Sequence, residues 1–97
     1  MTVEQYRELE ASSRGCCDIC GATARGRSLS VDHCHETGRV RGLLCHHCNT
    51  AIGLFREDPA LIAESLVYLV GVSGAFDVLV DAARRRDITF RETAVAR

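Results

Sequence analysis

The chain has 97 residues, a formal net charge of −1 and 46% hydrophobic residues. This length suits one compact domain, and the apolar content excludes an intrinsically disordered chain. The charge argues neither for nor against nucleic acid as a partner, although all twelve basic residues are arginine, which binds phosphate in a bidentate manner. The segment 14–47 is locally basic, with five arginines against three acidic residues, and this weakly favours a phosphate-bearing partner.

Six cysteines in so short a chain would fit a secreted disulfide scaffold, but two features oppose that class. The N-terminal stretch MTVEQYRELE has no apolar run, so we expect no signal peptide. The cysteines come as close pairs beside histidines, which is the spacing of metal ligands. The longest apolar stretch, around residues 66–72, is too short to cross a membrane. We therefore expect a soluble intracellular protein with no membrane partner.

The first expected element is a short helix within residues 1–15. Thr2 and Gln5 fit a capping box, in which each side chain pairs with the other residue's backbone N–H. Tyr6 would lie on the apolar face of this helix, which should end near Ser12, where small and polar residues break the pattern.

Two C-x-x-C pairs, separated by 24 residues, lie within the segment 16–56. Four thiolates arranged in this way form a tetrahedral zinc site. We assign a structural zinc to these four side chains: Cys17, Cys20, Cys45 and Cys48. In so small a chain the zinc would contribute much of the folding energy, about 10 kcal/mol in model fingers. The alternative is a site that swaps in Cys16, Cys34 or a histidine, but we expect both of those cysteines to be bystanders.

Between the cysteine pairs the pattern predicts a β-hairpin. Residues 29–31 alternate apolar and polar like a short strand, 36–38 are turn material, and 40–44 form the return strand. A helix should then run from about Cys45 to about Phe55. The predicted fold class is α+β, a small zinc-stapled hairpin-and-helix core flanked by short helices.

Two further helices are expected within residues 57–86, and residues 87–97 look like a loose tail. Asp58 and the proline after it form a helix start. Helical spacing predicts that the following apolar residues face inward: Leu61, Ile62, Leu66, Leu69 and Val70 in the first helix, and Phe76, Leu79, Val80 and Ala83 in the second. Residues 71–74 interrupt the pattern. The arginine run 84–86 is more typical of a solvated helix end than of a DNA clamp.

Asp32, His33 and Asn49 are not needed by a four-cysteine zinc site. The plainer interpretation is that Asp32 and Asn49 cap or orient their surroundings, while His33 packs partly buried. However, carboxylate and amide oxygens are hard ligands that suit Mg²⁺, and an adjacent neutral imidazole can deprotonate water. The three residues therefore favour a second, catalytic site with the chemistry of phosphodiester hydrolysis.

The stretches CDICG, LSVDHCHETGRVRGLLCHHCN and AIGLFREDPALIAESLVYL resemble the phage recombination endonuclease VII family, within the HNH or His-Me finger nucleases. The resemblance covers residues 2 to about 70. It implies a ββα-metal core, two antiparallel strands and a helix pinned by structural zinc. It also implies a DNA endonuclease dependent on Mg²⁺ or Mn²⁺, encoded by a phage or prophage and acting in the bacterial cytoplasm.

The resemblance further implies roles for individual residues. The four cysteines of the C-x-x-C pairs match the zinc ligands, and Asp32 and Asn49 match the ligands of the catalytic metal. His33 matches the general base that activates water, leaving 5′-phosphate and 3′-hydroxyl ends. His35 matches a histidine that contacts or positions the scissile phosphate.

By the same resemblance, Arg39 and Arg41 on the return strand would touch the DNA backbone. Three departures from the family pattern matter. Position 34 is a cysteine, Cys34, where relatives often have a polar or acidic residue. Ile52 stands where some relatives place a carboxylate, one helical turn after the asparagine. A long helical region associated with dimerisation and four-way-junction recognition is not evident, since only residues 71–97 remain.

A DNA endonuclease is favoured over two other classes, a non-catalytic zinc-stabilised nucleic-acid-binding module and a disulfide-rich or redox protein. His46 and His47 are expected to face solvent or to support the zinc ligands rather than to bind a catalytic metal. The sequence leaves open whether the substrate is a junction, a nick, a specific site or any duplex. It equally leaves open whether the protein forms a homodimer.

Overall fold

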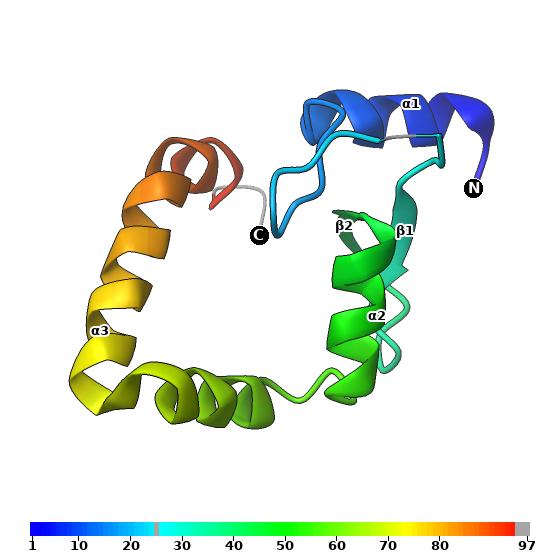
Figure 1. Cartoon of the computed structure of the whole chain (residues 1–97). Coiled ribbons are helices and arrows are strands. Elements are labelled where there is room, and N and C mark those ends of the chain that lie inside the picture. Colours follow the sequence, from blue (N-terminus) through cyan, green and yellow to red (C-terminus); the bar gives the residue numbers. More distant parts are fainter. Residues whose placement is uncertain (25, 95–97) are drawn as a thin grey trace. The chain divides into compact units, whose positions relative to one another are not determined.

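The computed structural model of the chain describes residues 1–24 and 26–94, with side chains in the last helix described up to residue 85. The elements are α1 (Val3–Ser12), β1 (Ser30–His33), β2 (Val40–Leu44), α2 (His46–Leu54) and α3 (Pro59–Ala94) (Figure 1). They form two compact units, Met1–Glu57 and Asp58–Arg97, and the single domain expected from the sequence stays a prediction. The fold class is α+β, as predicted, with three helices, a β-hairpin followed by a helix, and a four-cysteine cluster.

The helix α1 begins at the predicted capping box. Thr2 Oγ1 accepts a hydrogen bond from the backbone N of Gln5 at 3.1 Å, and Gln5 Oε1 accepts one from the backbone N of Thr2 at 2.8 Å. The hydroxyl of Tyr6 donates to the carbonyl of Leu29 at 2.9 Å, and Tyr6 and Leu9 pack against the core. The helix is therefore fixed to the chain just before β1.

The strands β1 and β2 form an antiparallel hairpin with one irregularity. Asp32 lies opposite Gly42, and His33 lies opposite Val40, so Arg41 is an extra residue on β2. A bulge of this kind bends the strand and re-aims the side chain of the extra residue. Arg41 is thereby released from the regular alternation of the strand.

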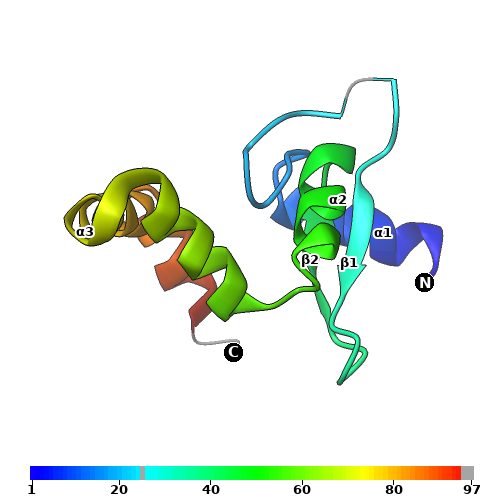
Figure 2. The ribbon, with the colours of Figure 1, turned by 60° about the horizontal axis from the view of Figure 1, so that its bottom comes forward.

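The core of the first unit is small. Its buried side chains are Cys17, Leu29, Leu43 and Leu44, each at most 4% exposed. The helix α2 packs against both strands (Figure 2), with Ile52 partly buried against this cluster. Because a core of this size rarely suffices to fold a chain, the unit calls for a further cross-link, which a metal bound by the four-cysteine cluster would provide.

The turn that carries the first cysteine pair is tied to β2 by Asp18. Its Oδ2 atom accepts hydrogen bonds from the backbone N of Leu43 at 2.8 Å and from the hydroxyl of Ser13 at 2.9 Å. Its own backbone N donates to the carbonyl of Leu43 at 2.9 Å. Gly42 makes this approach possible, because a Cβ atom there would lie 2.3 Å from Asp18 Oδ2. A side chain at position 42 would push Asp18 off the strand.

The second unit contains α3, which starts as predicted. The Oδ1 atom of Asp58 accepts hydrogen bonds from the backbone N of Ala60 at 2.9 Å and of Leu61 at 3.4 Å, and Pro59 is the first helical residue. This arrangement satisfies two of the N–H groups that a helix start leaves unpaired.

The helix α3 bends at Gly71, whose backbone (φ 77°, ψ 172°) is not helical and is accessible to glycine without steric cost. Helix resumes at the next residue, so the interruption is shorter than the predicted 71–74. The backbone stays helical to Ala94, past the predicted start of a loose tail at residue 87. The side chain of Arg86 and residues 95–97 lie outside the described part of the chain.

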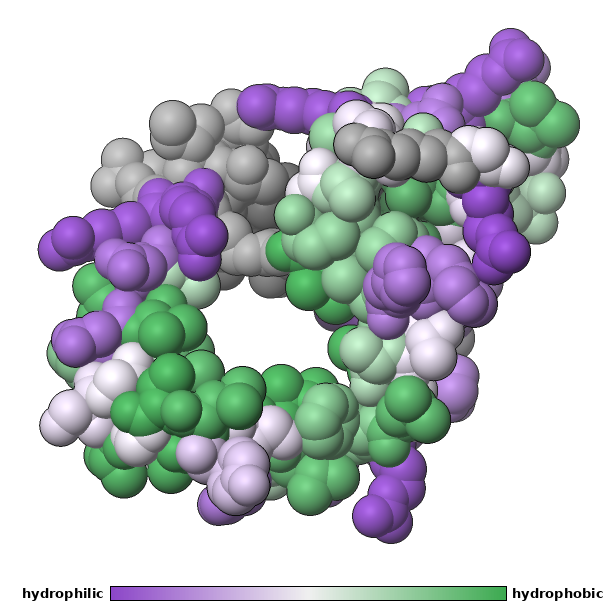
Figure 3. Space-filling model, in the orientation of Figure 1, coloured by the Kyte–Doolittle hydropathy of each residue, from purple (hydrophilic) through white to green (hydrophobic). Residues whose placement is uncertain are grey.

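The predicted inward apolar faces of α3 are wrong for most of their members. The exposed ones are Ile62, Leu69, Val70, Phe76, Leu79 and Ala83, and Figure 3 shows the apolar surface that they help to form. Leu61, Leu66 and Val80 are half-buried, and Ala75 is the one buried side chain among the described residues of this unit. Helical spacing identifies side chains that share a face, but another element must cover that face before it is buried.

By length and composition alone, Pro59–Arg85 is long and apolar enough to cross a membrane. The stretch 66–72, on which the expectation of no membrane span rested, is by itself too short for one. Two features oppose a span. Gly71 interrupts the helical backbone near the middle, where lipid offers no water to pair the freed groups. Asp77 lies inside the apolar stretch, and a carboxylate near the bilayer centre costs about 2.5–3.5 kcal/mol. These two features argue against a span, and the absence of a membrane partner stays a prediction.

Candidate active site and metal centre

The structure brings the four predicted zinc ligands together. The sulfurs of Cys17, Cys20, Cys45 and Cys48 all lie within 4.8 Å of one another. Cys20 Sγ and Cys45 Sγ are 3.7 Å apart, close to the edge of a tetrahedron with metal–sulfur bonds of about 2.3 Å. The same distance excludes a disulfide, whose sulfurs are about 2.0 Å apart. The cluster is therefore of the structural zinc type.

The electrostatics of the cluster also call for a cation. Backbone N–H groups donate to the sulfurs of Cys17, Cys20 and Cys45 at 3.4 Å. Burial raises the pKa of the Cys17 thiol, but backbone hydrogen bonds outweigh burial and leave that pKa at about 6. Burial, and then the neighbouring thiols, raise the pKa of Cys48. Four thiolates this close would repel one another, and a divalent cation would offset much of that repulsion.

The other two cysteines do not belong to the cluster. The thiol of Cys16 donates to the carbonyl of Arg14 at 3.3 Å. Cys34 is half-buried in the hairpin loop, where hydrogen bonds from Thr37 lower the pKa of its thiol. Their positions fit the predicted role of bystanders to the metal.

His46 and His47 lie in the first turn of α2 and are exposed. Their ring centroids are 6.0 Å apart, and both side chains line an open cavity of about 510 Å³ together with Arg27. Neither imidazole enters the cysteine cluster. Both are placed as solvent-facing side chains, as predicted.

The carboxylate of Asp32 is held by the guanidinium of Arg41. The Nε atom of Arg41 donates to Asp32 Oδ2 at 2.6 Å, and its Nη2 atom donates to Oδ1 at 3.0 Å and to the carbonyl of His33 at 3.2 Å. The Asp32 side chain is 11% exposed. Hydrogen bonds to Asp32, and then to Glu57, raise the pKa of Arg41. A bidentate pair of this kind fixes both partners, and the bulge in β2 places Arg41 for it.

Glu57 joins these residues from the end of α2 and was not among the predicted site residues. One carboxylate oxygen accepts a hydrogen bond from Arg41, and the other lies 2.7 Å from His35 Nδ1. The turn that brings it there has left-handed backbone at Arg56 (φ 56°) and Glu57 (φ 54°), and Glu57 N donates to the carbonyl of Ile52 at 2.8 Å. Glu57 directly precedes the helix start at Asp58, where an acidic residue is favourable, so the sequence alone did not single it out.

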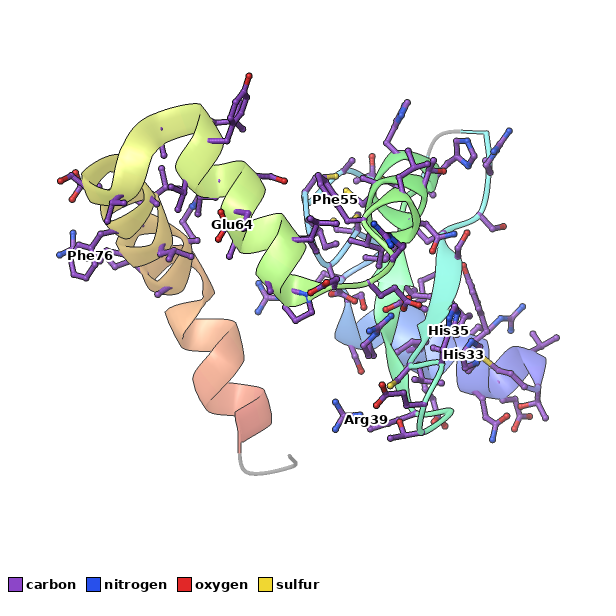
Figure 4. All side chains as sticks on the ribbon, turned by 90° about the horizontal axis from the view of Figure 1, so that it is seen from below. His33, His35, Arg39, Phe55, Glu64 and Phe76 are labelled. Atoms are coloured by element: carbon purple, nitrogen blue, oxygen red, sulfur yellow. The ribbon has the colours of Figure 1, made fainter. Side chains whose placement is uncertain are left out.

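The remaining predicted site residues are exposed. His33 ends β1, and His35 and Arg39 follow in the hairpin loop (Figure 4). Asn49 lies in the first turns of α2, with its backbone N bonded to the carbonyl of Cys45 at 2.9 Å. Among the described residues, Arg41 forms side-chain hydrogen bonds with both Asp32 and Glu57. These contacts do not include the side-chain amide of Asn49.

Arg41 uses its donors inside this group of residues, on two carboxylates and a carbonyl. Its predicted contact with DNA therefore competes with four intramolecular hydrogen bonds and stays a prediction. Arg39 is exposed in the loop, and its backbone N bonds to Thr37 Oγ1 at 3.2 Å. Of the two arginines, Arg39 is the one whose side chain faces solvent without these constraints.

Comparison with known proteins identifies one family. A family model described as recombination endonuclease VII matches residues 1–71. No curated protein and no solved structure matches the chain. The matched segment includes all of Met1–Glu57, and hence both the cysteine cluster and the contacts among Asp32, Arg41, Glu57 and His35.

Proposed function

Because the chain belongs to the recombination endonuclease VII family, we propose that it is a divalent-metal-dependent DNA endonuclease stabilised by zinc in its four-cysteine cluster. One observation carries the proposal. The hairpin ends β1 on Asp32 and His33, and the helix that packs on it carries Asn49 directly after Cys48 of the cluster. A cross-link at the cysteines therefore also fixes the elements that carry the candidate catalytic residues.

Asp32 and Asn49 are the proposed ligands of a catalytic Mg²⁺ or Mn²⁺. Their oxygens are the hard donors that these ions prefer. The pairing of Asp32 with the Arg41 guanidinium supports the fit, because it shows that this carboxylate suits a positively charged partner. When bound, the divalent ion would offset negative charge on the phosphate and on the leaving oxygen.

His33 is the proposed general base. Its imidazole is exposed at the end of β1, so it can take a proton from a water molecule that approaches the scissile phosphate. His35 is the proposed phosphate-contacting residue, and Arg39 in the same loop would bind the DNA backbone. Cleavage by this mechanism would leave 5′-phosphate and 3′-hydroxyl ends.

The test is cleavage of supercoiled plasmid by the purified zinc-loaded protein in Mg²⁺ or Mn²⁺. We expect nicking or linearisation by the wild type, and a loss of about 100-fold or more in His33→Ala, as befits removal of a general base. Asp32→Ala should lose cleavage as well. Both variants should keep their zinc, because neither residue belongs to the cysteine cluster.

His47→Ala is the matched control, since it removes an exposed imidazole from α2 without touching the proposed site. It should cleave like the wild type. EDTA also removes zinc, so the variants rather than the chelator decide the question. A wild type that binds plasmid and a four-way junction but cleaves neither would instead favour the non-catalytic zinc-stabilised nucleic-acid-binding module.

We also propose that the protein forms a homodimer through the apolar side chains of α3. Leu69, Phe76 and Leu79 are more than half exposed, and association is the usual way to cover such a surface. Light scattering of the wild type and of Phe76→Gln tests this. A dimer in the wild type that weakens in the variant supports it, and a wild-type monomer at high concentration contradicts it. A dimer would carry two active sites, which suits cutting of both strands.

A further inference from the structure

We propose that Glu57 is a positioning residue of this active site, whose one carboxylate fixes both the imidazole of His35 and the guanidinium of Arg41. This inference rests on the proposed function. Glu57 is an acidic side chain at the centre of the contacts described above, with 19% of its side chain exposed. Its two oxygens face two different partners, so its effect on the site is transmitted through both.

The contact with His35 determines which ring nitrogen is free. Glu57 Oε2 lies 2.7 Å from His35 Nδ1, and a carboxylate only accepts hydrogen bonds, so Nδ1 carries the proton. Nε2 is then the atom left for substrate. The His35 side chain is 83% exposed, and an imidazole so exposed would otherwise rotate freely. Glu57 therefore sets both the tautomer and the direction of the ring.

The contact with Arg41 divides one positive charge between two carboxylates. The guanidinium binds Asp32 through two nitrogens and Glu57 through one of them. Without the Glu57 carboxylate, Arg41 would be committed to Asp32 alone and would neutralise it more fully. With Glu57 present, two negative charges face one positive charge, and this surplus favours a divalent cation at Asp32.

The local cost of placing Glu57 supports a role for its side chain. Two successive residues, Arg56 and Glu57, adopt positive φ angles without being glycine, at about 1–2 kcal/mol each. A connection with no further task would favour glycine or asparagine here. The contacts to His35 and Arg41 offset these costs.

The first experiment measures the tautomer of His35 by the ¹⁵N shifts of its imidazole, in zinc-loaded protein at a pH where the ring is neutral. In the wild type the proton should be on Nδ1. In Glu57→Gln the amide has one acceptor oxygen, which the charged Arg41 should take, so its NH₂ group faces His35 and the proton should move to Nε2. Glu36→Gln removes the same charge from an exposed position in the same loop and should leave the Nδ1 proton in place.

The second experiment compares the plasmid cleavage kinetics of the same variants. Glu57→Gln should lower kcat by about tenfold or more with little change in KM, as for other residues that orient a metal-site ligand. Glu57→Asp keeps the charge and should recover part of the loss, while Glu36→Gln should match the wild type.

The inference is overturned if His35 carries its proton on Nε2 in the wild type. It is equally overturned if Glu57→Gln leaves the tautomer or kcat unchanged. A wild type that cleaves no DNA would sink the proposed function instead, and the imidazole shifts would still decide whether Glu57 positions His35.

Discussion

The two units of the chain are both rich in apolar residues, yet they bury them very differently. The first unit, Met1–Glu57, contains Cys17, Leu29, Leu43 and Leu44 as buried side chains, whereas the described part of Asp58–Arg97 contains Ala75. In the first unit a hairpin, a turn and a helix meet at four sulfurs. In the second, the described residues form one bent helix, and no other helix or strand of that unit is described opposite it. Burial therefore follows from cross-connection and not from apolar content.

The largest test of this comparison is removal of the cysteine cluster. Cys45→Ser should lose zinc and unfold the first unit, because metal binding contributes about 10 kcal/mol to such small domains. The backbone amides of β1 and β2 should exchange with solvent freely, while exchange in α3 should change little. Metal analysis and hydrogen exchange by mass spectrometry measure the two effects.

Cys34→Ser is the control for this variant, since Cys34 lies outside the cluster. It should retain one zinc per chain and the exchange pattern of the wild type. Zinc retained at full stoichiometry in Cys45→Ser would show that another ligand replaces this sulfur.

A pair of leucine substitutions sharpens the comparison. Leu43 is completely buried in the first unit, and Leu69 is 74% exposed in the second. Leu43→Ala should lower the free energy of unfolding of the zinc-loaded protein by about 2–5 kcal/mol, whereas Leu69→Ala should change it by at most about 0.5 kcal/mol. Urea titration followed by circular dichroism measures both. Equal losses would mean that Leu69 is covered in solution, as it would be in a dimer.

Two glycines give a smaller contrast within the first unit. A Cβ atom at Gly42 would collide with Asp18 Oδ2, while one at Gly53 meets nothing within 4 Å. Gly42→Ala should cost about 1–3 kcal/mol, because it detaches the Asp18 carboxylate from the backbone of Leu43. Gly53→Ala should stabilise by up to about 1 kcal/mol through helix propensity. A Gly42→Ala protein as stable as the wild type would argue against the Asp18 contact.

The smallest expected effect concerns the docking of α1. Tyr6→Phe removes the hydroxyl that donates to the carbonyl of Leu29 and should cost about 0.5–1.5 kcal/mol in the same titration. Tyr68 is 88% exposed on α3, so Tyr68→Phe should leave the stability unchanged. A loss in Tyr68→Phe as large as that in Tyr6→Phe would mean that the second unit is more tightly packed than its exposure indicates.

Much of the fold could be predicted from the sequence because its signals are local. The capping box at Thr2, the return strand Val40–Leu44 and the helix start at Asp58 lie where expected, since each depends on residues a few positions apart. Which side chains of α3 are buried could not be predicted in this way. The periodicity of Leu69 and its neighbours describes the helix alone and contains no information on a covering partner.

The candidate site also contains parts that local sequence signals predict and parts that they do not. The spacing of the cysteines was enough to predict their cluster, which the structure contains, whereas the catalytic roles of Asp32, His33 and Asn49 remain predictions. Glu57 could not be found from a motif. Its carboxylate reaches His35 and Arg41 only after the left-handed turn behind α2 and the bulge in β2 have formed, and its contact with Arg41 spans 16 residues of sequence.

Cys45 connects metal binding with the formation of α2. Its sulfur belongs to the cysteine cluster and is also the N-cap acceptor for Cys48 N at 3.4 Å. A helix of nine residues nucleates poorly by itself, so capture of the metal and the first turn of α2 should be one kinetic event. Asn49 lies in that turn. Newly synthesised chains should therefore stay incompletely folded until they bind zinc. The rate at which folded molecules form should rise with the free zinc concentration.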